Sequence, residues 1–106
     1  ASDKFGIGYS GIGYKTADVR AIPLGLSSDG PLIAPEAANA YSGEYPLSRF
    51  LYLSVNYKPG SQLDPLRREF LRYVLSSNGQ AGVLKDGYLP ITATIATRSL
   101  ASVGLE

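Results

Sequence analysis

Glycine alternates with larger apolar or aromatic residues near the start of the chain. Residues 5–14 read FGIGYSGIGY, and the stretch GIGY occurs twice within them. A period of two is typical of a β-strand, and glycine at every other position lets a second backbone or a helix approach closely. We therefore expect a strand over residues 5–14, with Gly8 and Gly11 required for close packing or for unusual backbone angles.

Two further stretches are predicted to be extended. Residues 19–24 are mostly aliphatic, and Pro23, which cannot donate to a ladder, ends this strand or places it at an edge. Residues 49–57 read RFLYLSVNY, and their first half is apolar on both faces. A strand without polar alternation is typical of the centre of a sheet that is covered on both sides.

Capping signals predict two helices and the loop that precedes the first. Residues 25–34 carry loop residues, after which a short helix should follow Pro35 and end at Gly43 in a left-handed conformation. A longer helix should begin after Asp64 as N-cap, with Pro65 in the first helical position. Its apolar stripe is formed by Leu66, Phe70, Tyr73 and Val74, widened by Leu71 and Leu75.

The last third of the chain is predicted to be helical as well. Ser77 and Gln80 have the spacing of a capping box, which predicts a helix from about residue 78 to 85. Residues 92–104 fit either a strand, because of their threonines, or a helix, and we predict the helix. Strands that alternate with helices predict an α/β protein with a mixed sheet flanked by helices.

Composition narrows the possible chemistry. The chain has 106 residues, which allows one domain at most, and its formal net charge of +1 does not indicate a nucleic-acid-binding surface. Cys and His are absent, which excludes thiolate or imidazole zinc sites and Ser-His or Cys-His nucleophile pairs. We therefore predict a protein that is not an enzyme and has no metal and no cofactor. Because Met is also absent, we expect a segment of a longer protein.

Two local patterns suggest phosphate chemistry but have simpler explanations. Residues 6–11 match G-x-G-x-x-G, yet these glycines fall inside the expected strand, whereas a dinucleotide-binding turn needs them between a strand and a helix. Arg67, Arg68 and Arg72 form a basic cluster with Glu69 among them. We interpret this cluster as the solvated face of a helix.

Four blocks, in this order, resemble the C-terminal part of the phosphate-binding proteins that serve phosphate ABC transporters. They are residues 6–9 (GIGY), 45–52 (YPLSRFLY), 69–76 (EFLRYVLS) and 79–90 (GQAGVLKDGYLP). The resemblance implies the type-2 periplasmic-binding-protein fold, in which two α/β lobes close on a ligand at a hinge. Residues 1–106 would then be a C-terminal segment, forming a single domain or part of one.

Few residues of this chain match the ligand-binding residues of that family. In that family the anion is held mainly by backbone amides, hydroxyls, an Arg and an Asp of the first lobe and by a Ser-Gly-Thr-type loop. Here Ser10-Gly11 and Ser42-Gly43 are not followed by Thr. Ser10, beside the expected crossing between the lobes, is the one candidate ligand residue.

The resemblance implies a non-catalytic solute-binding protein for phosphate or a related oxyanion. Its expected partners are that anion, a membrane ABC transporter permease and the missing N-terminal half, and its expected location is periplasmic or extracellular. The alternative is a structural, self-associating α/β module without a ligand of its own. An isolated chain is expected to leave strand edges and apolar surface open, which favours homo-oligomers.

Overall fold

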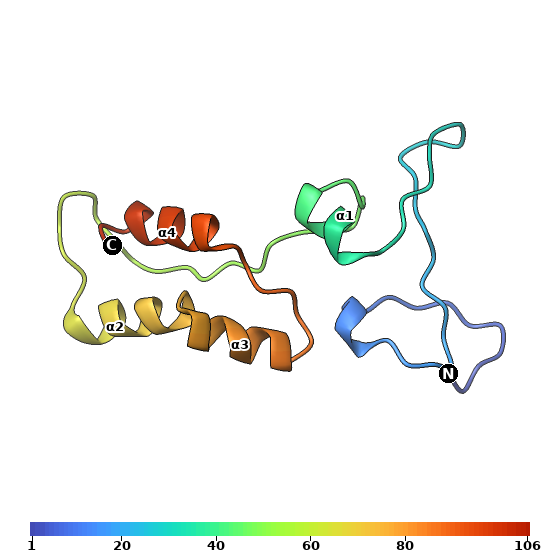
Figure 1. Cartoon of the computed structure of the whole chain (residues 1–106), viewed down its shortest axis with the longest axis horizontal. Helices are drawn as coiled ribbons and strands as arrows, with labels where there is room; N and C mark the ends of the chain where they lie inside the picture. Colours follow the sequence, from blue (N-terminus) through green and yellow to red (C-terminus); the bar gives the residue numbers. More distant parts are fainter. The chain divides into compact units, whose positions relative to one another are not determined.

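The computed structural model describes residues 1–106 and divides them into two compact units, residues 1–52 and residues 53–106 (Figure 1). The elements, in chain order, are the 3₁₀-helix η1 (Ile12–Tyr14) and the α-helices α1 (Ala37–Ser42), α2 (Pro65–Val74), α3 (Ser77–Lys85) and α4 (Ala93–Ser102). The first unit is mostly irregular, and the second contains three of the four α-helices.

Besides η1, the first unit contains one β-bridge and one short α-helix. Leu24 and Ile33 exchange two backbone hydrogen bonds across the predicted loop, with N···O distances of 3.0 and 2.8 Å. Helix α1 follows, and Gly43 ends it in the left-handed region at φ 79°, as predicted. The Asn39 side chain donates to the Ala34 carbonyl at 2.9 Å and so joins α1 to the segment before it.

The predicted mixed sheet is absent from the structure. Residues 5–14, 19–24 and 49–57 form no ladder, and the Leu24–Ile33 bridge is the only strand-like pairing. A strand is stabilised by a neighbour that accepts and donates its backbone hydrogen bonds, and no other segment of this chain takes that place. The stretch predicted to be central is correspondingly exposed, and Tyr52 is 83% exposed.

The prediction that Gly8 and Gly11 are required for close packing or unusual backbone angles is also wrong. A Cβ atom added at Gly8 would meet nothing within 4 Å, and Gly11 has an ordinary φ of −63°. Phe5, Ile7 and Tyr9 are exposed. No second layer covers this stretch, so close packing does not require Gly8.

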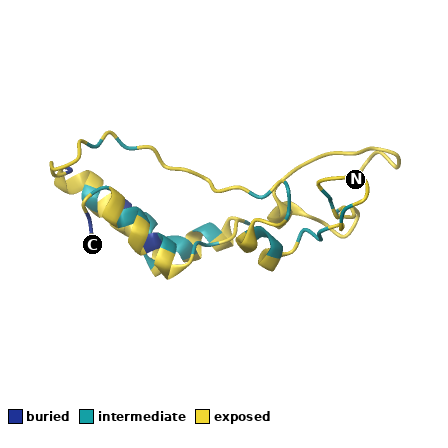
Figure 2. Ribbon diagram, turned by 90° about the horizontal axis from the view of Figure 1, so that it is seen from above, coloured by how far each residue is buried: buried dark blue, intermediate teal, exposed yellow.

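The second unit has a small hydrophobic core. Figure 1 shows α2 and α3 following one another almost in line, with α4 running alongside them. Leu63, Leu71 and Leu105 are buried together, and the partly buried residues packed against them are Val55, Tyr57, Leu100 and Val103. The buried residues of the chain, which also include Ala96 of α4, all lie in this unit (Figure 2).

Helix α2 begins as predicted but faces the core differently. Asp64 is its N-cap and accepts a hydrogen bond from the Arg67 amide at 3.2 Å, and Pro65 is its first residue. Leu71 is buried, whereas Leu66 and Phe70 of the predicted stripe are 80% and 53% exposed. The core of this unit therefore lies against the Leu71 side of the helix.

At the junction between α2 and α3, the helix cap differs from the capping box predicted from the sequence. Ser76, not Ser77, is the N-cap of α3, and its hydroxyl accepts a hydrogen bond from the Gly79 amide at 3.2 Å. The Gln80 side chain does not return to the cap. Its amide nitrogen donates to the Val74 carbonyl at 2.8 Å, and its oxygen accepts from the Ile91 amide at 2.9 Å. Gln80 thus ties the end of α2 to the segment that follows α3.

The tail of the chain is helical, as predicted. Helix α4 has Thr92 as N-cap, whose hydroxyl accepts a hydrogen bond from the Ile95 amide at 3.2 Å. The chain then turns at Gly104 with φ 75°. This turn brings Leu105 back into the core beside Leu71.

Candidate functional site

Ser10 lies in the first unit, in an exposed segment just before η1. The residue between them, Gly11, is the N-cap of η1 and offers no side chain to a ligand. A helix of one turn has little dipole to offer an anion, because the dipole is summed from many aligned peptides. The structure therefore places Ser10 at the surface, next to a helix too short to attract an anion.

The longer helices begin at side-chain caps of their own. Asp64, Ser76 and Thr92 each accept a hydrogen bond from an amide in the first turn of α2, α3 and α4. The Arg67 amide, helped by its guanidinium, lowers the pKa of Asp64 below its usual 3.8. The start of α2 therefore carries a carboxylate, and an anion would be repelled there.

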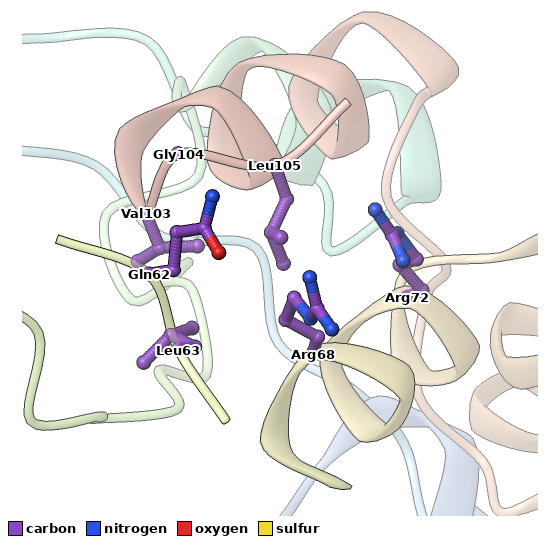
Figure 3. Close-up of a pocket in the computed structure, with 7 residues that line it drawn as sticks. All are labelled: Gln62, Leu63, Arg68, Arg72, Val103, Gly104 and Leu105. Atoms are coloured by element: carbon purple, nitrogen blue, oxygen red, sulfur yellow. The ribbon is translucent and has the colours of Figure 1, made fainter. Parts of the chain in front are cut away.

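A positively charged cavity is the most site-like feature of the second unit. It encloses about 80 Å³. Figure 3 shows Arg68 and Arg72 rising from the same side of α2 toward the segment that follows α4. The residues that line the cavity are Gln62, Leu63, Arg68, Arg72, Val103, Gly104 and Leu105.

The two arginines of the cavity have different partners. Arg72 forms an ion pair with Glu69, with 2.7 Å between Nη1 and Oε1. Arg68 is half-buried and forms no ion pair, and its Nε atom is buried without a hydrogen-bond partner. Arg67, in contrast, is an exposed residue that pairs with Asp64 at 2.6 Å.

The interpretation of the basic cluster as a solvated face therefore holds for Arg67 and Arg72, which are exposed and ion-paired, but not for the half-buried Arg68. Arg68 and Arg72 are four residues apart and lie on one side of α2, next to the buried Leu71. The four-residue spacing between Arg68 and Arg72 is the signal in the sequence that places these two arginines on one side of the helix, apart from Arg67. For Gln80, which bonds to Val74 and Ile91, nothing in the sequence indicates this linking role.

The structure contains neither a metal-binding cluster nor a membrane-spanning helix. No three or more acidic side chains lie close enough together to hold a metal ion. None of the helices has the length and apolar character that crossing a bilayer requires.

Comparison with known proteins identifies the class of protein that this chain resembles. No family model matches the chain. It is 49% identical over 100 residues to the phosphate-binding protein PstS of Pseudomonas aeruginosa PAO1, which covers 94% of this chain and 31% of the relative. It is 30% identical over 104 residues to the phosphate-binding protein PstS 2 of Streptococcus agalactiae 2603 V/R, which covers 98% of this chain and 32% of that relative.

The resemblance to phosphate-binding proteins is confirmed along nearly the whole chain. The matched part of the Pseudomonas relative is a C-terminal segment, as the sequence blocks predicted. The chain spans about a third of the length of the curated relatives that it matches. The similarity implies a periplasmic-binding-protein fold, although the predicted mixed sheet is not present in the structure.

Proposed function

We propose that this chain is the C-terminal segment of a solute-binding protein that captures phosphate or a related oxyanion and delivers it to an ABC transporter in the membrane. The observation that carries the proposal is the 49% identity over 94% of the chain to a protein named for phosphate binding. The segment takes part in binding and has no catalytic role. The longer protein acts outside the cytoplasmic membrane, in the periplasm or the extracellular space.

The exposed apolar side chains of the segment fit a role as part of a larger lobe. Phe50, Leu51, Tyr52 and Leu53 are each more than half exposed, although they form the most hydrophobic stretch of the chain. In the longer protein we infer that residues 49–57 and 5–14 pair as strands with upstream segments and complete the mixed sheet. That pairing would satisfy backbone groups that this chain alone leaves to solvent.

Segment replacement tests the proposal. The 100 matched residues of the Pseudomonas relative would be replaced by the corresponding residues of this chain, and phosphate binding by the purified chimera would be measured by calorimetry. We expect saturable one-to-one binding with an affinity within tenfold of that of the unmodified relative. A folded chimera that fails to bind phosphate would contradict the proposal and would favour the self-associating module.

The same chimera tests Ser10 as a ligand residue. A hydroxyl that donates to an anion contributes about 1.5–3 kcal/mol, so Ser10→Ala should weaken phosphate binding about tenfold or more. Ser42→Ala is the matched control, because Ser42 also precedes a glycine but its hydroxyl is engaged locally with Asn39 and Glu44. If the two variants bind phosphate with equal affinity, Ser10 is not a ligand residue.

A further inference from the structure

The cavity beside α2 contains more positive charge than its own residues neutralise. Arg67 and Arg72 each have a carboxylate partner, but Arg68 has none. The Arg68 Nε–H group is buried and donates to no protein atom. A buried donor without an acceptor is unfavourable, and two guanidinium groups on one helix face repel each other. An anion in the cavity would relieve both of these costs.

The shape and lining of the cavity fit a small anion that carries several oxygen atoms. The volume of about 80 Å³ has room for a few water-sized groups. A guanidinium presents planar N–H groups that bind carboxylate or phosphate-like oxygens two at a time. The side-chain amide of Gln62 can supply a further donor. Leu63 and Leu105, both buried, form apolar walls that reduce competition from water.

We propose that Arg68, Arg72 and Gln62 form an oxyanion-binding site. Its ligand class is an anion with at least two adjacent oxygens, supplied either as a free inorganic oxyanion or as a carboxylate. Arg68 is the principal ligand because its guanidinium has no competing ion pair, and Arg72 assists while remaining bonded to Glu69. Its residues belong to the second unit, whereas Ser10 belongs to the first, and the site does not rest on the proposed function.

Nuclear magnetic resonance of the 106-residue chain tests this site directly. The Nε–Hε signals of the arginines would be followed while sodium sulfate or sodium acetate is added, with sodium chloride at equal ionic strength as the reference. We expect saturable shifts of the Arg68 and Arg72 signals with at least one oxyanion and only small, linear shifts with chloride. Saturation by sulfate identifies a free inorganic oxyanion as the ligand, and saturation by acetate alone identifies a carboxylate.

Variants separate a site from general attraction of anions. Arg68→Gln should raise the dissociation constant at least tenfold, and Arg68→Lys should raise it less, because lysine keeps the charge but loses the planar fork. Arg67→Gln is the matched control and should change the constant less than twofold. Circular dichroism would verify that each variant keeps its helices. Shifts that do not saturate with either oxyanion, or that Arg68→Gln leaves unchanged, would overturn the proposal.

Discussion

At the scale of single residues, Ser76 and Gln80 organise the junction between α2 and α3. The Ser76 hydroxyl accepts a hydrogen bond from the Gly79 amide and donates one to the Tyr73 carbonyl at 2.6 Å. Gln80 bonds to Val74 on one side and to Ile91 on the other. Polar side chains therefore satisfy backbone groups that the end of one helix and the start of the next leave free.

Removal of the Ser76 hydroxyl should destabilise the chain. An N-cap substitution of this kind costs about 0.5–2 kcal/mol, so we expect Ser76→Ala to lower the free energy of unfolding by that amount in a urea titration. Ser77→Ala is the control and should be nearly neutral, because Ser77 is an exposed residue inside the first turn. If Ser77→Ala destabilised the chain more than Ser76→Ala, Ser77 would be the N-cap, as the capping box predicted from the sequence.

Two glycines of α3 should respond oppositely to alanine. A Cβ atom at Gly79 would collide with the carbonyl oxygens of Tyr73 and Val74, whereas one at Gly82 would meet nothing within 4 Å. Gly79→Ala should therefore destabilise the chain by about 1–3 kcal/mol through overpacking. Gly82→Ala should stabilise it by about 0.5–1 kcal/mol, because alanine loses less conformational freedom in a helix. Thermal unfolding of both variants would measure the difference, and similar melting temperatures would contradict the described junction.

At the scale of elements, α2 depends on the charge of its N-cap. The Arg67 amide and guanidinium stabilise the ionised Asp64 carboxylate, so the pKa of Asp64 is lower in the folded chain than its usual 3.8. A depressed carboxyl pKa contributes stability that is complete above the unfolded pKa. That contribution is lost as the pH falls through the folded pKa.

Acid titration should show this dependence. We expect the free energy of unfolding to fall as the pH drops below about 4, and the fall to be smaller in Asp64→Asn, because asparagine also caps helices but does not ionise. Arg67→Gln should keep part of the dependence, since the hydrogen bond from the backbone amide is the largest single cause of the lowered pKa and does not need the guanidinium. Identical acid profiles for the native chain and Asp64→Asn would show that Asp64 contributes nothing to it.

At the scale of the whole molecule, the chain buries little apolar surface. Only Leu63, Leu71, Ala96 and Leu105 are buried, and many large apolar side chains, among them Leu66, Phe70 and Tyr73 on one side of α2, are exposed. Exposed apolar patches of this kind mark surfaces that contact other protein. The length of the relatives, about three times that of this chain, indicates that a complementary upstream part exists in proteins of this kind.

The isolated chain should therefore associate with itself or with that upstream part. We expect light scattering to detect oligomers of the 106-residue chain alone. The chain should form a one-to-one complex when it is mixed with the Pseudomonas relative lacking its matched segment. Phe70→Glu should weaken this complex at least tenfold because it places a charge in an apolar contact, whereas Asn78→Glu adds the same charge at an exposed polar position and should not. If the chain is a monodisperse monomer and does not bind the truncated relative, the prediction is contradicted.

The helices of this protein could be predicted from the sequence because their signals are local. Asp64 and Pro65 set the start of α2, Gly43 ends α1 with a positive φ, and the threonine-rich tail is helical as expected. Each of these signals acts through hydrogen bonds or backbone angles within one turn of chain. The capping box was misplaced by one residue, since Ser76 and Ser77 are adjacent serines with the same local preference.

Only the tertiary structure decided which side of each element is buried and which extended stretches remain unpaired. The apolar pattern of residues 5–14 and 49–57 predicted strands, but a ladder needs a partner strand and none of the described segments supplies one, and Ile12–Tyr14 form the 3₁₀-helix η1 instead. In the same way, α2 has apolar residues on two sides, and contact with Leu63 and Leu105 selects the side of Leu71. That selection buries the Nε atom of Arg68 and exposes Phe70, because burial depends on residues distant in the sequence.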